Sequence, residues 1–132
     1  MKVKTSELAG AALNWAVIVA EHRRHDWNNP LHIEHFNEIR NRHVLHQQGH
    51  YSTNWSQGGP IIEREGIELL CNVTATEAER FTHAEADWQA FYRSNRSTEA
   101  RQYARTPLIA AMRCYVASKL GDEVDIPEEL LL

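Results

Sequence analysis

The chain has few cysteines and no long apolar run, and each shortage excludes a class of protein. Cys71 and Cys114 are its two cysteines, too few for a disulfide framework, so both are expected to be reduced, packed thiols. No apolar stretch approaches the roughly 18 residues that cross a bilayer. The start "MKVKTSEL" lacks the apolar core of a signal peptide. We therefore expect a cytoplasmic protein without membrane contact.

A nucleic-acid surface is disfavoured by the charge balance. The formal net charge is −4, whereas broad nucleic-acid surfaces are basic. The basic residues are unevenly placed, however, because the stretch from 93 to 105 holds Arg93, Arg96, Arg101 and Arg105. At 132 residues the chain is expected to form one domain, large enough to fold without a disulfide or metal.

Two segments carry clear helix signals. Residues 6–22 begin with Ser6 as an N-cap and repeat apolar residues at helical spacing, so we predict a helix at the centre of the fold. Residues 106–121 have Thr106 as cap and Gly121 as stop, which predicts a second helix. The polar, His-rich segment 23–50 has helix signals at both ends. A capping box predicts one more helix over residues 77–86.

The strand predictions are shorter. Residues 52–60 have the composition of a loop. Residues 61–63 and 67–73 are suited to strands on either side of a turn or bulge at Gly66. The stretch 87–92 fits a strand and a helix equally well, and that choice stays open.

Residues 123–127, "EVDIP", predict a last strand that ends at proline. The expected fold class is therefore α+β. A small, mostly antiparallel sheet from residues 61–73, 87–92 and 123–126 would pack against two main helices.

The eight histidines raise the question of a metal site. His43, His46 and His50 are spaced i, i+3, i+7, which places them on one face of a helix. No HExxH motif or nearby cysteine pair completes a ligand set. A solvated polar surface explains the pattern better, so neither a metal nor another cofactor is expected.

Catalytic signatures are also missing. There is no G-x-S-x-G motif, and neither cysteine has a histidine next to it in sequence. Glu63 and Glu65 are spaced as paired carboxylates, but a charged strand edge has the same pattern. These observations favour a binding protein over an enzyme.

The stretch 51–69, "YSTNWSQGGPIIEREGIEL", is the first candidate for a binding site. Gly58 and Gly59 allow backbone N–H groups to approach an anion, Trp55 offers a stacking face, and Glu63 can accept hydrogen bonds from a ribose. Further hydrogen-bonding side chains come from Ser52, Thr53, Asn54 and Gln57. The alternative interpretation makes Trp55 a core anchor, the glycines a tight turn and Glu63 an edge charge.

Arg113 is the second candidate, because it interrupts the apolar run "LIAAMRCYVA". A charged group there must reach solvent, pair with an acid or meet a ligand. Pairing with Glu63 or Glu65 and binding a phosphate or carboxylate both remain open.

The strings "MKVKTSELAGAALNWAV", "YSTNWSQGGPIIEREGI" and "TPLIAAMRCYVASKLGDEVDIP" resemble the NinX-type phage proteins. The resemblance covers roughly residues 1–20, 51–70 and 106–130, and Trp88-Gln89-Ala90 is a further match. Asn14 and Asn54 depart from the aspartate that the family often has.

This resemblance implies a small phage accessory protein acting in the host bacterial cytoplasm, without an established activity. It implies one NinX-like domain over residues 1–132, with a variable His-rich insertion at about 23–50. The matching segments are expected to meet in space, so that Trp55, the glycine pair and Arg113 surround one concavity.

The leading hypothesis is a non-enzymatic protein that sequesters a small nucleotide-derived ligand, such as a host immune signal. Trp55 or Trp88 would stack on a base, and Gly58, Gly59 and Arg113 would hold phosphates. A homo-oligomer is expected, because such sites often lie at symmetric interfaces. The alternatives are a factor in phage DNA or RNA metabolism, and an inhibitor that contacts a host protein through residues 23–50.

Overall fold

The computed structural model describes residues 1–22, 49–71, 87–92 and 100–131. The described helices are α1 (Gly10–His22), α3 (Trp55–Glu65) and α5 (Pro107–Leu120). The described strands are β1 (Lys2–Lys4), β2 (Ile67–Cys71), β3 (Trp88–Tyr92), β4 (Gln102–Ala104) and β5 (Glu123–Asp125). Short 3-10 turns span Thr5–Glu7 and Glu128–Leu130. The expected α+β class is confirmed.

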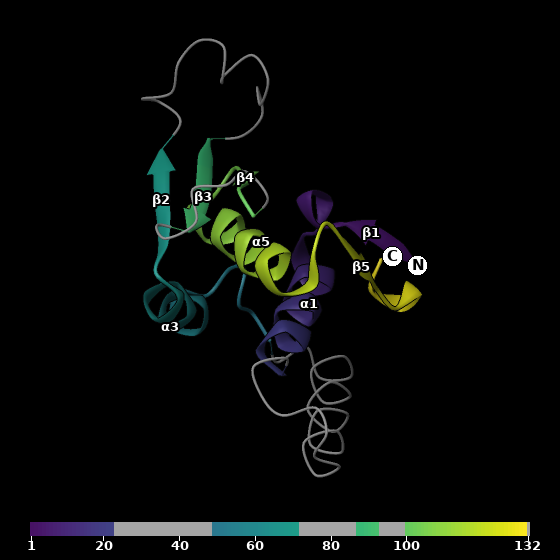
Figure 1. Cartoon of the computed structure of the whole chain (residues 1–132). Coiled ribbons are helices and arrows are strands. Elements are labelled where there is room, and N and C mark those ends of the chain that lie inside the picture. The colour runs from purple at the N-terminus through teal and green to yellow at the C-terminus, as the bar shows by residue number, and fades with distance from the viewer. Residues whose placement is uncertain (23–48, 72–86, 93–99, 132) are drawn as a thin grey trace.

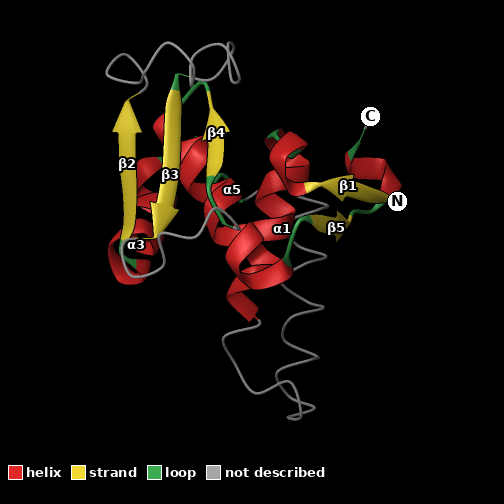
Figure 2. Cartoon of the chain, turned by 45° about the horizontal axis from the view of Figure 1, so that its top comes forward, coloured by secondary structure: helices red, strands yellow, loops and turns green. Residues whose placement is uncertain are grey.

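The strands form two antiparallel sheets rather than one. One sheet has the order β2-β3-β4, with Leu69 opposite Ala90. The other pairs β1 with β5, with Val3 opposite Val124. Figures 1 and 2 show the two sheets on opposite sides of α5 and α1. The prediction that residues 123–126 join the larger sheet is therefore wrong, because β5 pairs with a strand at the N-terminus that the sequence did not indicate.

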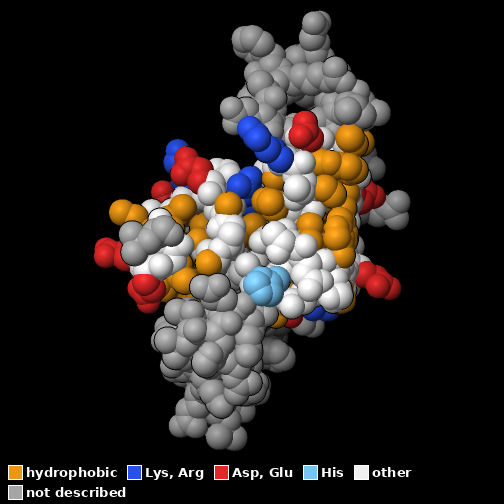
Figure 3. Space-filling view, turned by 180° about the vertical axis from the view of Figure 1, so that it is seen from behind, with side chains coloured by type: hydrophobic (Ala, Val, Ile, Leu, Met, Phe, Trp, Pro, Cys, Tyr) orange, Lys and Arg blue, Asp and Glu red, His pale blue; other side chains and the backbone are white. Residues whose placement is uncertain are grey.

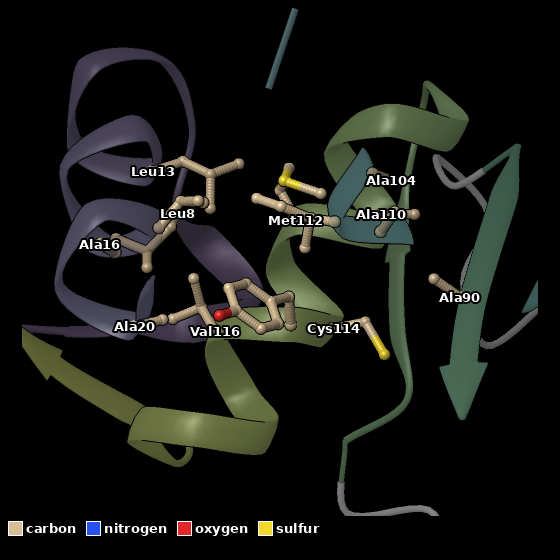
Figure 4. Packing of buried hydrophobic residues seen from close by; sticks show 14 of the residues in the cluster. Leu8, Leu13, Ala16, Ala20, Ala90, Ala104, Ala110, Met112, Cys114 and Val116 are labelled. Carbon is tan, nitrogen blue, oxygen red and sulfur yellow. The ribbon is translucent and has the colours of Figure 1, made fainter. Parts of the chain in front are cut away.

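Helix α5 occupies the centre of the described fold, in place of the predicted segment 6–22. It contacts α1, α3, all three strands of the larger sheet, and β5. In Figure 4, Met112 and Val116 point toward α1 while Cys114 points toward the sheet. Tyr115, at the same level of the helix, is fully buried. A helix covered on nearly every side needs apolar residues all round. The stretch "LIAAMRCYVA" of α5 has this pattern, with Arg113 as its one charged residue.

Helix α1 begins at Gly10, four residues later than predicted. Ser6 lies in the preceding 3-10 turn and is not the N-cap of α1. The cause is Thr5, whose N–H donates to Asp122 O at 2.7 Å and whose hydroxyl donates to Gly121 O at 2.6 Å. These bonds fix the chain against the end of α5 before Leu8 enters the core.

The largest difference from the prediction is α3, which replaces the strand expected over 61–63 and the loop expected over 52–60 from residue 55 onward. Asn54 caps its start, and Gly66 ends it in the left-handed conformation with φ 69°, where glycine is favoured. Ile61 is buried against the core. Tertiary packing and both caps thus outweigh the poor helix propensity of two glycines and Pro60.

The structure confirms the predicted helix at 106–121 and two of the predicted strands. The strand at 67–73 is confirmed as β2 as far as Cys71, and 87–92 contains strand β3. Helix 106–121 is confirmed with the predicted cap, since Thr106 Oγ1 accepts from the Ile109 N–H at 3.2 Å. The predictions for 23–48 and 77–86 lie outside the described residues. Among the described helices, none has the length and apolar character needed to span a bilayer.

Candidate functional site

Trp55 lies at the surface, at the first residue of α3, with 52% of it exposed. The interpretation of Trp55 as a core anchor is therefore wrong. Asn54 Oδ1 accepts from the Ser56 N–H at 2.9 Å and caps the helix. A Cβ placed on Gly59 would lie 3.9 Å from Trp55 Cε3, so the indole lies along the helix. With Thr53 also exposed, an accessible aromatic ring stands beside hydroxyl and amide groups.

The two glycines lie inside α3, not in a turn. Gly58 is buried, and its N–H donates to Asn54 O at 3.0 Å. A Cβ placed on Gly58 would lie 2.5 Å from Tyr51 O and 2.6 Å from Leu108 Cδ1. Gly58 therefore allows α3 to pack closely on α5, and its N–H already has an acceptor. Gly59 has no such neighbour.

Ser52 fastens the segment before α3 to α1. It is 1% exposed, and Asn14 Oδ1 accepts from its N–H at 3.0 Å and from its hydroxyl at 2.7 Å. Gln57 Oε1 accepts from the His50 N–H at 2.8 Å. Both Asn14 and Asn54 act here through an acceptor oxygen, a role that an aspartate carboxylate can also fill.

Glu63 and Trp88 lie on different elements, α3 and β3. Glu63 is exposed on α3 and makes no hydrogen bond or ion pair with another described residue. Trp88 is half-buried in β3, between Cys71 of β2 and Ala104 of β4. Of the two tryptophans proposed to stack on a base, Trp55 is the more accessible.

Arg113 is half-buried, and its hydrogen bonds go to backbone carbonyls. Its Nε donates to Leu8 O at 2.7 Å and its Nη1 to Tyr103 O at 2.8 Å. Of the two alternatives left open for Arg113, pairing with Glu63 or Glu65 is therefore not found among the described residues. The three matching segments do meet around α5, but Arg113 binds β4 and the segment before α1 rather than α3.

A polar network that the sequence analysis missed joins α1, α3 and α5. Glu21 Oε1 accepts from Tyr115 Oη at 2.6 Å and from Arg64 Nη2 at 2.5 Å. Arg64 Nη2 also lies 3.2 Å from Tyr115 Oη, and its guanidinium carbon is 5.7 Å from the centre of that ring. Both charged groups are about a quarter to a third exposed, so the pair lies at the rim of the core.

The network continues from Arg64 to β3 and the end of α5. Glu65 Oε2 accepts from Arg64 Nε at 3.2 Å, and Lys119 Nζ lies 3.3 Å from Glu65 Oε1. Tyr92 Oη lies 2.9 Å from Ser118 Oγ and donates to Glu65 at 3.4 Å. Two acids and two bases balance in charge, which indicates a structural junction more than a site for an external ion.

Burial and pairing set the protonation of this junction. Burial raises the pKa of Tyr92 and of Tyr115 well above the ordinary tyrosine value, so both remain neutral. Burial alone would raise the pKa of Glu65, but hydrogen bonds from Arg64 and Lys119 outweigh it and lower that pKa. Glu65 is therefore a stable carboxylate, which makes it a poor general base.

We predict that Glu65→Gln flattens the acid limb of the stability curve. Because the folded pKa of Glu65 is lowered, its contribution is present above the unfolded pKa and is lost as the pH falls through the folded pKa. Chemical denaturation between about pH 3 and pH 6 covers this range. Glu63→Gln is the control, since Glu63 makes no ion pair with a described residue. Equal pH dependence in both variants would contradict the prediction.

Metal and thiol chemistry find no support in the part of the chain that the structure describes. No group of three His, Cys, Asp or Glu side chains is placed to hold an ion there. Burial raises the pKa of the Cys114 thiol to about 12, which leaves it protonated and unreactive. Both cysteines are free thiols, as predicted.

The predicted arginine cluster is described only at Arg101 and Arg105, since 93–99 lie outside the described residues. Arg101 Nη1 donates to Gln89 Oε1 at 2.5 Å, and its guanidinium lies 4.6 Å above the Phe91 ring. Figure 3 shows hydrophobic side chains gathered over this sheet, with Lys and Arg side chains near the middle of the same face. Arg101 is thus engaged in covering the sheet.

Comparison with protein families identifies the family of this chain. The family model described as "Bacteriophage P22, NinX" matches residues 4–119. This range takes in α1, the segment around Trp55, the larger sheet and nearly all of α5. No curated protein matches the chain.

Proposed function

The chain belongs to the NinX family of phage proteins, and from this premise we propose that it binds and sequesters a small nucleotide-derived ligand in the host cytoplasm. The observation that carries the proposal is the accessible Trp55 ring at the capped start of α3. The ring stands beside exposed hydroxyl and amide groups, and every nucleobase offers a face for stacking.

The groups around Trp55 suit recognition without catalysis. Thr53 and Ser56 are exposed hydroxyls next to Trp55 in sequence, and Glu63 is an exposed carboxylate about two turns further along α3. The paired charges of the Glu65 network are engaged with one another, and no described residue offers an activated nucleophile. The biological role would be capture of a host immune signal, by analogy of class and size with other small phage proteins. A symmetric homo-oligomer, measurable by light scattering, would double the binding surface.

We predict that Trp55→Ala lowers ligand retention about tenfold or more without unfolding the protein, because stacking contributes roughly 1–3 kcal/mol per base. The purified protein would be incubated with lysate from phage-infected cells, denatured, and its released molecules analysed by mass spectrometry. Leu70→Ala is the matched control, since Leu70 is also an exposed apolar side chain, 40% accessible, but lies on β2.

Two results would overturn the proposal: no nucleotide-like mass enriched by the natural protein, or equal enrichment by Trp55→Ala. Binding of an oligonucleotide with a steep dependence on salt would instead support a role in phage DNA or RNA metabolism.

A further inference from the structure

Two hydrogen bonds fix the guanidinium of Arg113 and leave some of its N–H donors unused. Its bonds to Leu8 O and Tyr103 O use Nε and one N–H of Nη1. A guanidinium carries five N–H donors in a rigid fork, so three remain. Since β4 and the segment before α1 both fix the side chain, little conformational freedom is left to lose when a ligand binds.

The charge of Arg113 has no counter-ion among the described residues. Arg64 and Lys119, by contrast, both meet carboxylates. Burial lowers the pKa of Arg113, yet an arginine stays protonated at neutral pH. A half-buried charge that only carbonyl dipoles compensate is unfavourable, and an arriving anion would recover that free energy.

The start of α1 beside Arg113 has a partial charge of the same sign as the guanidinium, and the one acid on the segment before it, Glu7, is exposed to solvent. Leu8, which accepts from Arg113, lies two residues before the start of α1, and the first turn of that helix contains no acid. The backbone is open there: Ala9, Gly10 and Ala11 are exposed, and a Cβ on Gly10 would meet nothing within 4 Å. The partial positive charge of a helix start would add to the guanidinium; alone it would not make a site.

We propose that Arg113, beside the first turn of α1, binds an oxyanion of the phosphate class. The planar fork of arginine matches two oxygens of a phosphate, and the exposed amides of α1 offer further donors. The site draws on α5, β4 and the segment leading into α1, and on no residue of α3. It therefore stands independently of stacking at Trp55.

Calorimetric titration of the full chain with inorganic pyrophosphate, at constant low ionic strength, tests the site. We expect saturable binding that Arg113→Gln weakens about tenfold or more, the loss expected for charged hydrogen bonds. Arg105→Gln removes the same charge from an exposed residue just beyond β4 and should weaken binding less than about twofold if the contact is specific. Absent binding, or equal loss in the two variants, would overturn the proposal.

Amide resonances of the unmutated protein give an independent measurement, in case Arg113→Gln does not fold. Pyrophosphate should shift the Gly10 and Ala11 amides and the Arg113 Nε resonance; shifts confined to other segments would refute the site. Trp55→Ala should leave pyrophosphate binding unchanged, because no residue of α3 contributes to the site. Failure of the stacking proposal is therefore distinguishable from failure of this one.

Discussion

Gly58→Ala is expected to destabilise the protein by about 2 kcal/mol, the upper range of the cost of overpacking less the gain in helix propensity. The new Cβ would lie 2.5 Å from Tyr51 O and 2.6 Å from Leu108 Cδ1, well inside van der Waals contact. The carbonyl belongs to the backbone and cannot rotate away, so α3 must move off α5, and such overpacking typically costs about 1–3 kcal/mol or more. The roughly 1 kcal/mol that alanine gains over glycine in helix propensity offsets only part of this.

Gly59→Ala is the matched control for that variant. The substitution and the helix are the same, but the nearest atom to the new Cβ would be Trp55 Cε3 at 3.9 Å, an ordinary contact. Gly59→Ala should therefore be neutral or stabilising by up to about 1 kcal/mol. Thermal and urea unfolding would separate the two variants by roughly 5–10 °C in Tm. Similar Tm values for both would show that α3 does not pack on α5 as described.

Helix α5 could be predicted from the sequence, whereas helix α3 could not. For α5, propensity, cap and apolar pattern agree, so Thr106 and Gly121 bounded the helix correctly. For α3, two glycines and Pro60 oppose the helix, and only tertiary contacts decide the outcome. Asn54 and Gly66, a cap and a stop at helical separation, were the available signal.

The sequence indicated individual residues of the candidate site, but it did not indicate which groups they contact. Exposure of Trp55 follows from its place at a helix start, which required knowing that α3 exists. Arg113 was recognised as anomalous from its apolar neighbours, yet its partners Leu8 and Tyr103 are backbone carbonyls, which have no sequence signature. The junction of Glu21 with Tyr115 spans 94 positions, and no local pattern reports such a pairing.

Asn14→Leu is expected to destabilise the protein by about 2–4 kcal/mol. The leucine has a similar size, but it removes the oxygen that accepts from the N–H and hydroxyl of Ser52. Ser52 is 1% exposed, so neither donor can turn to water, and each buried unsatisfied donor costs about 1–3 kcal/mol. Hydrogen exchange at the Ser52 amide should accelerate as well, because this bond fixes the segment before α3.

Asn14→Asp separates the loss of an acceptor from the loss of an amide. The carboxylate keeps an oxygen for both Ser52 donors, and stronger bonds to a charged acceptor offset the unfavourable burial of that charge. Its stability at neutral pH should stay within about 1 kcal/mol of the natural protein, in keeping with the aspartate that the family resemblance implies at this position. Urea unfolding of the two variants measures the difference. Equal destabilisation by leucine and aspartate would show that the Asn14 amide nitrogen, rather than its oxygen, holds α1 to the segment that presents Trp55.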